Sequence, residues 1–332
     1  LSLHPWAKMA KYARSGGEAN AIAVRIARAA SKKDGIAICG YHGWHDWYLS
    51  VNLTGQNNLT KHLLKGLEPI GVPRSLKNTV YPFKYGDYEE IKKIVKSNKI
   101  GTIKMEVGRL GLPDVVFLKK VRKLATKNKI VLIFDECTSG FRETFGGLHK
   151  KYNVEPDIAI FGKALGNGYA ITAIIGRSEI MEAAQTSFIS STFWTERIGP
   201  TAALKTLEIM EKTKSWNYIT DIGTKIRDRW QMLGKKFNLD MNFFGLNALS
   251  GFSFNSKSAL AYKTYITQEM LKKGYLAGTS IYCCTAHTDQ IINSYFDDLE
   301  PIFLTIAECE NGKDIVKLLD GPECHSGFKR LN

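Results

Sequence analysis

Two side chains of opposite charge follow short apolar runs in the middle of the sequence. Asp135 directly follows the apolar run at 130–134, and Lys163 follows a second run, at 158–161, and one glycine. Short apolar runs of this kind are typical of strands that are buried on both faces of a parallel sheet. Open α/β sheets bind their ligands at the carboxyl ends of such strands. We therefore expect a carboxylate and an amine at the same edge of one sheet.

Such a pair suits the chemistry of pyridoxal phosphate (PLP). A lysine in a partly apolar site can lose its proton and form a Schiff base with an aldehyde, and PLP is such an aldehyde. Its ring nitrogen must keep a proton to draw electrons from the substrate, and a buried aspartate favours that protonated form. Taken singly, Asp135 could instead be a capping or ion-paired acid, and Lys163 a solvated surface residue.

The segments around both residues resemble the motifs of one enzyme family. DECTSGFR, at 135–142, is similar to the D-E-V-x-T-G-F-R segment of class III, fold-type I, PLP-dependent aminotransferases. FGKALGNG, at 161–168, is similar to their G-K-x-x-G-G-G lysine segment, and the glutamate-1-semialdehyde aminomutase-like members are the most similar. The resemblance implies that Asp135 contacts the pyridine nitrogen and that Lys163 forms the internal aldimine. It also places Cys137, where the family has Val, against one face of the ring.

A glycine-rich turn precedes a helical pattern near the start of the chain. Ser15, Gly16 and Gly17 stand before apolar residues at helical spacing. The N–H groups and the dipole of a helix N-terminus can bind phosphate, although ordinary helix entry with Ser15 near the cap is the alternative. The resemblance to the family's S-G-T-E-A segment favours a phosphate site formed by the backbone of Gly16 and Gly17. Gly17 stands where the family often has Thr.

Two more candidates follow a strand predicted at 36–39. The sequence there reads Y-H-G, and the family's matching segment implies that Tyr41 covers the pyridine ring. We place His42 in the same site. His42 and His45 could also be read as metal ligands, but no Cys or acidic cluster completes such a site, so we predict no metal.

Two further residues are assigned through the resemblance. Glu106 ends a strand predicted at 100–106 and matches the glutamate of the family's E-P segment, with a role near the cofactor or in a structural hydrogen bond. Thr192 matches a threonine that binds the cofactor phosphate of the other subunit. If Thr192 acts in this way, the functional unit is at least a dimer, and we expect a homodimer.

Length and periodicity predict an α/β protein with two domains. The alternation of strands and helices predicts a mainly parallel central sheet with helices on both faces, as in fold-type I PLP-dependent transferases. We expect a large PLP-binding domain at 1–233 and a small C-terminal α/β domain at 234–332. A single long helix at 199–233 should connect them, and a strand is expected at 281–285. The chain starts close to the first motif, so we expect it to lack the N-terminal segment of the family.

Composition limits the other classes of function. The 332 residues are 44% hydrophobic, and no apolar stretch reaches the ~20 residues of a membrane helix. The six cysteines show no paired spacing, which favours free thiols and a cytoplasmic location. The net charge is +14, but the lysines are spread along helical faces, so we predict neither a nucleic-acid nor a membrane partner.

We therefore predict a PLP-dependent aminotransferase that moves an amino group between a small-molecule amino donor and a carbonyl acceptor. Lys163 would also carry the proton between substrate and cofactor carbons. An intramolecular 2,1-aminomutase of the glutamate-1-semialdehyde type uses the same machinery, and no residue decides between the two. A non-catalytic scaffold of this fold is a third possibility, against which the presence of both Asp135 and Lys163 argues. The donor, the acceptor, and the roles of Arg197 and of the stretch at 275–287 are left open.

Overall fold

The computed structural model describes residues 1–55, 58–59, 66–97, 99–108 and 111–327. These residues form two compact units. The larger unit comprises residues 1–108 and 113–214, and the smaller one residues 111–112 and 215–327. The compact units divide between Lys214 and Ser215, whereas the expected domain boundary follows Leu233.

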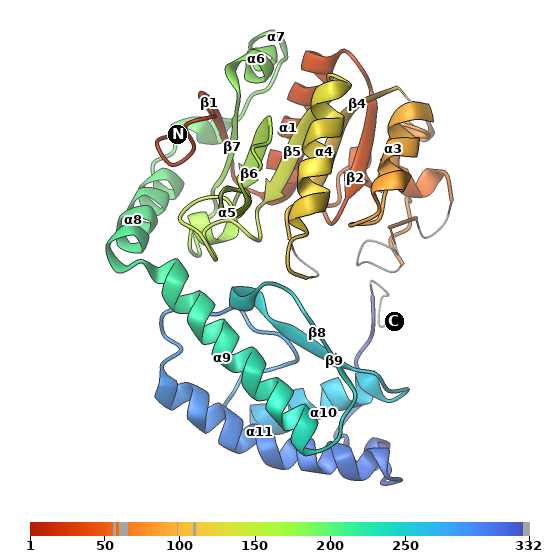
Figure 1. Ribbon diagram of the computed structural model, residues 1–332, viewed down its shortest axis with the longest axis vertical. Helices are drawn as coiled ribbons and strands as arrows, with labels where there is room; N and C mark the ends of the chain where they lie inside the picture. The colour runs from red at the N-terminus through yellow and green to blue at the C-terminus, as the bar shows by residue number, and fades with distance from the viewer. Residues whose placement is uncertain (56–57, 60–65, 98, 109–110, 328–332) are drawn as a thin grey trace. The chain divides into compact units, whose positions relative to one another are not determined.

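The larger unit is built on a seven-stranded sheet with the order β1-β7-β6-β5-β4-β2-β3 (Figure 1). Strands β3, β2, β4, β5 and β6 are parallel, whereas β7 is antiparallel to β6 and β1 is antiparallel to β7. The predicted mainly parallel α/β sheet is thus confirmed. The strands are β1 (Met9–Ala13), β2 (Gly35–Cys39), β3 (Val80–Pro82), β4 (Ile100–Glu106), β5 (Val131–Glu136), β6 (Ile158–Phe161) and β7 (Thr172–Gly176).

Helices cover both faces of this sheet (Figure 1). Helix α1 (Gly16–Ser31) packs through Ala19, Ala23 and Ala27 against apolar residues of β5, β6 and β7. Small side chains along one stripe let the helix approach the strands closely, and the helix N-terminus lies near the carboxyl ends of β5 and β6. On the other face lie α3 (Tyr88–Ser97) and α4 (Val115–Lys127).

Short helices connect these elements. The α-helices among them are α2 (Asp46–Leu49), α5 (His149–Tyr152), α6 (Ser178–Met181) and α7 (Ala183–Thr186). The 3₁₀ helices of the larger unit are η1 (Ser50–Leu53), η3 (Arg74–Leu76), η4 (Lys163–Leu165) and η5 (Thr192–Thr195). The stretch at 52–82 is rich in Gly, Asn and Pro, which predicts a loop, and it falls partly outside the described residues.

The long helix predicted at 199–233 is wrong, because the chain forms two helices there. Helix α8 (Ile198–Thr213) ends at Lys214, whose φ of 51° is left-handed, and α9 (Ser215–Lys236) begins with the next residue. A left-handed residue interrupts the hydrogen-bond ladder of a helix. Apolar periodicity on both sides of Lys214 hides this break in the sequence.

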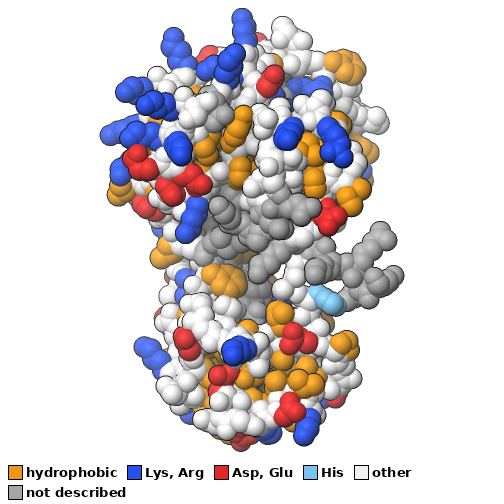
Figure 2. All heavy atoms as spheres, turned by 90° about the vertical axis from the view of Figure 1, so that its right-hand side faces the viewer, with side chains coloured by type: hydrophobic (Ala, Val, Ile, Leu, Met, Phe, Trp, Pro, Cys, Tyr) orange, Lys and Arg blue, Asp and Glu red, His pale blue; other side chains and the backbone are white. Residues whose placement is uncertain are grey.

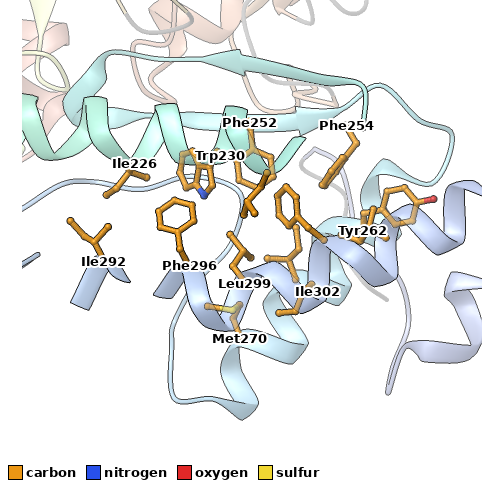
Figure 3. Packing of buried hydrophobic residues seen from close by; sticks show 14 of the residues in the cluster. Ile226, Trp230, Phe252, Phe254, Tyr262, Met270, Ile292, Phe296, Leu299 and Ile302 are labelled. Carbon is orange, nitrogen blue, oxygen red and sulfur yellow. The ribbon is translucent and has the colours of Figure 1, made fainter. Parts of the chain in front are cut away.

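The smaller unit packs three helices against a two-stranded antiparallel sheet. The helices are α9, α10 (Ala259–Lys272) and α11 (Asp289–Glu310), and the strands are β8 (Met241–Phe244) and β9 (Gly251–Phe254). Two 3₁₀ helices, η6 (Asn247–Leu249) and η7 (Ile315–Leu318), complete the unit. Its core is aromatic, and the rings of Trp230 and Phe252 lie 4.8 Å apart (Figure 3).

The strand predicted at 281–285 is wrong. In that region only Ser280 forms a β-bridge, with Gly251, and residues 281–284 have no regular structure. Cys283 is buried in the core of the smaller unit, whereas Cys284 is exposed. Apolar residues here fill a core without pairing their backbone in a ladder.

The surface of the larger unit carries many basic side chains. Figure 2 shows Lys and Arg on the face turned to the viewer, with Asp and Glu among them. This mixture fits the interpretation of the lysine-rich stretches as solvated helix faces. Within the described part of the chain, no helix is long and apolar enough to cross a membrane.

Candidate active site

Three chain segments converge where strands β5 and β6 end. The strands are parallel neighbours, and Asp135 is in register with Ile160, three residues before Lys163. A Cβ atom added to Gly16, at the start of α1, would lie 3.7 Å from Cys137 Sγ, and one added to Gly162 would lie 3.5 Å from it. The start of α1 and the ends of β5 and β6 therefore meet around Cys137.

Lys163 is held by a neighbour from the β5 segment. Its Nζ atom donates a hydrogen bond to Thr138 Oγ1 at 2.8 Å. The backbone of Lys163 is left-handed, with a φ of 44°. A non-glycine residue in this region is strained, and such strain is concentrated at functional sites.

Asp135 is a buried carboxylate with three donors around it. His42 Nδ1 lies 2.9 Å and Lys104 Nζ 3.4 Å from its Oδ2 atom, while the Cys137 N–H donates to Oδ1 at 3.1 Å. Burial alone would raise the pKa of Asp135, but the positive charge of Lys104 and the hydrogen bond from His42 hold it well below its usual value. Asp135 is therefore ionised at neutral pH.

His42 is fully enclosed beneath this carboxylate. Its Nδ1 atom contacts Asp135, and its Nε2 atom lies 3.1 Å from the carbonyl oxygen of Cys39. Burial and the charge of Lys104 lower the pKa of His42 to about 4. His42 is therefore uncharged at neutral pH, and its contact with Oδ2 orients the Asp135 carboxylate.

Glu106 and Tyr41 are joined at the next strand ends. Tyr41 follows β2, and its N–H donates to Glu106 Oε2 at 3.0 Å. Between β2 and Tyr41 stands Gly40, with a φ of 105°, where an added Cβ would lie 2.4 Å from the same oxygen. A glycine is thus required for the close approach of this loop to Glu106. Of the two roles left open for Glu106, the structure shows the hydrogen bond.

Ser15, Gly16 and Gly17 form a capped helix start. Ser15 Oγ accepts from the N–H of Glu18 at 3.3 Å, and Glu18 Oε2 accepts from the N–H of Arg14 at 3.0 Å. This reciprocal arrangement satisfies the third helical N–H and leaves those of Gly16 and Gly17 without a partner inside the helix. Two backbone donors and the positive end of the helix dipole are thus available to an anion.

The ring of His45 explains why residue 17 has no side chain. A Cβ atom added to Gly17 would lie 2.7 Å from His45 Cε1. His45 in turn stacks on Trp44, with ring centroids 4.7 Å apart. The place of the threonine side chain that the family often has is therefore taken by an imidazole from the α2 segment.

Thr192 is not brought to the other candidates within one chain. It is exposed at the start of η5, and η5 is tied instead to β1, where Trp194 Nε1 donates to the carbonyl of Tyr12 at 2.9 Å. The predicted role of Thr192 concerns a second subunit and stays a prediction.

The residues present fit PLP in charge and in hydrogen-bonding capacity. The ionised carboxylate of Asp135 is of the right charge to accept a hydrogen bond from a pyridinium N–H. The start of α1 offers N–H donors to a phosphate, and the Lys163 amine is held by Thr138. No group of three His, Cys, Asp or Glu side chains suited to a metal occurs among the described residues.

Sequence reasoning missed Lys104, Thr138 and His45. Lys104 gave a signal, because it is a charged residue between apolar neighbours in the middle of the strand IGTIKME, all of which is buried. Thr138 and His45 gave none, since their roles depend on a hydrogen bond and a ring position that only the tertiary structure creates.

The sequence is similar to characterised enzymes. It is 35% identical over 305 residues to the 3-aminobutyryl-CoA aminotransferase of Cloacimonas acidaminovorans, covering 87% of this chain and 69% of that protein. It is 30% identical over 328 residues to the glutamate-1-semialdehyde 2,1-aminomutase of Sulfolobus acidocaldarius, covering 90% and 76% respectively.

Solved structures show the same fold. The FumI protein of Sphingopyxis sp. MTA144, in its PLP internal aldimine form, matches with a TM-score of 0.80 at 20% identity, covering 95% of this chain and 75% of that one. An omega-transaminase from Sphaerobacter thermophilus matches with a TM-score of 0.80 at 18% identity, covering 92% and 75%.

The family model "Aminotransferase class-III" matches residues 3–296, nearly the whole chain. With the fold and the relatives described above, this match shows that the chain belongs to the class III, PLP-dependent aminotransferases.

Proposed function

We propose that Lys163 binds PLP covalently and that the enzyme transfers an amino group between a small-molecule donor and a carbonyl acceptor. The observation that supports this most directly is the convergence of Lys163, Asp135 and the start of α1 around Cys137. Bound PLP supplies an electron-withdrawing ring that makes the substrate's α-proton acidic. The residues of this chain hold that ring, orient it and move the proton.

Each side chain has a separate task in this proposal. Asp135 binds the pyridinium N–H, and the N–H groups of Gly16 and Gly17, with Ser15 as the cap, bind the phosphate. Lys163 would move a proton between the substrate's α-carbon and the cofactor carbon that is bonded to the same nitrogen. Thr138 Oγ1, at 2.8 Å, orients the amine of Lys163.

The remaining candidates shape the ring pocket. We propose that Tyr41 and Cys137 contact the two faces of the ring. Burial and the charge of Asp135 raise the pKa of the Cys137 thiol, so Cys137 is a neutral packing group and not a nucleophile. We propose that His42 and Glu106 act by holding Asp135 and the Tyr41 loop in place.

We further propose that the enzyme is a homodimer. Exposed apolar side chains gather in the sequence around Thr192: Phe188 is 86% and Ile198 67% exposed, and Phe193 and Trp194 are also exposed. A surface of this kind is typical of a protein interface. We place the enzyme in the cytoplasm, because the six cysteines are free thiols.

The relatives define two substrate hypotheses. The aminotransferase of Cloacimonas acidaminovorans is named for 3-aminobutyryl-CoA, and the Sulfolobus acidocaldarius enzyme for glutamate-1-semialdehyde. We favour an aminotransferase reaction on an amine, because the higher identity is to the aminotransferase. The aminomutase reaction is the alternative, and it differs in that the amino group moves within one molecule and no separate acceptor is consumed.

The test is to add PLP to the purified protein, record its visible spectrum, reduce it with borohydride and map the adduct by peptide mass analysis. We expect a visible band and an adduct at Lys163. Folded protein with no adduct at Lys163 would overturn the proposal. Incubation with each candidate amine and a keto-acid acceptor then separates the reactions, since only an aminotransferase passes the amino group to the acceptor and converts it into an amino acid.

A further inference from the structure

A lysine lies buried beneath the carboxylate that faces the cofactor site. Lys104 is in the middle of β4, and its side chain is fully buried. It is in register with Ile133 of β5, two residues before Asp135, so Lys104 and Asp135 project from the same face of the sheet. Lys104 Nζ lies 3.4 Å from Asp135 Oδ2.

Stability alone is a weak reason for this ion pair. Transfer of two charges out of water costs free energy that their attraction often fails to recover, and apolar residues of similar volume are often as stabilising. Burial lowers the pKa of Lys104, and the negative charges of Asp135 and Glu106 act in the opposite direction. A charged residue in a fully buried strand therefore points to a role in the neighbouring site.

The charge of Lys104 acts on the protonation of His42. Both of its ring nitrogens face oxygen atoms, from Asp135 and from the carbonyl of Cys39, and a protonated imidazole would satisfy both. Burial, and then the positive charge of Lys104, lower the pKa of His42 to about 4. Lys104, Asp135 and His42 form a cluster in which Lys104 and His42 both contact Oδ2 of Asp135, and a charge on Lys104 opposes a second positive charge on His42.

We propose that Lys104 is a positioning residue that acts through Asp135 and His42. Its ammonium group balances the ionised carboxylate and leaves His42 neutral, so that the Asp135 charge that reaches the cofactor's ring nitrogen stays constant over the neutral pH range. This role rests on the proposed contact between Asp135 and that nitrogen. The charge balance of the cluster does not depend on a cofactor and can be tested without one.

The first experiment follows His42 in the cofactor-free protein. The protein is labelled with ¹⁵N-histidine, and the ring signals are titrated by NMR, with His42 assigned by the loss of its signal in a His42→Asn variant. In Lys104→Met, which removes the charge and keeps a chain of similar length, we expect the pKa of His42 to rise by about two to three units, because the opposing charge is gone. Lys93→Met, an exposed lysine of α3, is the matched control and should leave it unchanged.

The second experiment compares PLP with its 1-deaza analogue, in which a C–H group replaces the ring nitrogen. Dissociation constants are measured by fluorescence quenching from pH 6 to pH 9. For each protein, the preference for PLP is the dissociation constant of the analogue divided by that of PLP. The preference of Lys104→Met, divided by that of the wild type, should rise about tenfold from pH 6 to pH 9. The reason is that His42 loses its proton over this range and leaves Asp135 uncompensated. A purely structural role would weaken both ligands equally and give a constant ratio.

The outcomes separate this inference from the proposed function. An unchanged His42 titration in folded Lys104→Met, or a ratio that does not vary with pH, would overturn the role of Lys104. If Lys104→Met does not fold, Lys104→Gln, which keeps an N–H donor and loses the charge, is measured in the same two ways. If the wild-type protein binds no PLP, the proposed function fails, whereas the His42 titration still decides whether Lys104 sets the charge of the cluster.

Discussion

The amine of Lys163 and the hydroxyl of Thr138 are joined by a hydrogen bond of 2.8 Å between the segments that follow two parallel strands. The left-handed backbone of Lys163 turns the chain sharply after β6, which directs the side chain back toward β5. Since Thr138 Oγ1 is an acceptor of similar size to a methyl group, the contact can be removed without changing the shape of the site.

Replacement of Lys163 by Ala should abolish the borohydride adduct and lower the transamination rate by at least about a thousandfold, since general acid–base catalysis contributes on the order of 10²–10⁴. Thr138→Val should lower the rate only about fivefold, because a single neutral hydrogen bond contributes about 1 kcal/mol. Steady-state kinetics with a fixed donor measures both effects, and Lys119→Ala, an exposed lysine of α4, is the control. A Lys163→Ala enzyme that retains a tenth of the rate would contradict the assignment.

The close approach of Gly17 to His45 predicts that Gly17→Ala destabilises the protein when the His45 ring is present and stabilises it when the ring is absent. In the wild-type background, Gly17→Ala should destabilise the protein by about 1–2 kcal/mol, because its Cβ overlaps the imidazole ring. In a His45→Ala background the same substitution should stabilise the protein by up to about 1 kcal/mol, since alanine favours a helix more than glycine does. Urea unfolding of the wild type, the two single variants and the double variant gives the double-mutant cycle. Equal effects in both backgrounds would show that His45 does not restrict residue 17.

The buried part of the sheet could be predicted from the sequence with little error. The strands predicted at 100–106 and 158–161 match β4 and β6 residue by residue. For β6 the reason is that a strand covered on both faces has a continuous apolar sequence. The edge strands β1 and β3 were missed, since their half-exposed residues give no such run. The antiparallel direction of β7 depends on how its connection crosses the sheet edge, which local sequence does not specify.

The residues of the candidate site also divide into those that the sequence predicts and those that it does not. Asp135, Lys163 and the start of α1 stand at element ends, where the rule for ligand sites in α/β sheets applies directly. Lys104 lies inside a strand, and a search for apolar runs assigns no function to a charged residue at such a position. Its partner, Asp135, lies 31 residues away in sequence, and only the parallel register of β4 and β5 brings the two together.

Acid should destabilise the larger unit through its buried histidines. Burial, and then the positive charges of His149 and Lys150, lower the pKa of His4 to about 3, and that of His42 is about 4. In the unfolded chain a histidine titrates near 6.5, so between about pH 6 and pH 4.5 the unfolded state binds protons that the folded state does not. The stability is thus fully present above pH 6.5 and is lost as the pH falls.

Each histidine should contribute about 1.4 kcal/mol of unfolding free energy per pH unit in that window. His4→Gln keeps an acceptor for the Gly147 N–H, which donates to His4 Nε2 at 3.0 Å, and removes the titrating group. We expect the slope of unfolding free energy against pH to fall by about 1.4 kcal/mol per unit in this variant. His325→Gln changes an exposed histidine and is the control. An unaltered slope in His4→Gln would show that His4 is protonated to the same extent in both states.

A mixed dimer tests whether Thr192 acts across the interface. Thr192→Val should weaken PLP binding about tenfold or more in the homodimer, because a hydrogen bond to a charged phosphate contributes about 1.5–3 kcal/mol. A hybrid of one Lys163→Ala subunit and one Thr192→Val subunit, purified through two different tags, holds a single site with an intact lysine. If the partner subunit's Thr192 completes that site, the hybrid binds one PLP per dimer with wild-type affinity. If Thr192 serves its own chain, the same site keeps the weakened affinity of Thr192→Val, and a fluorescence titration of the hybrid distinguishes the two arrangements.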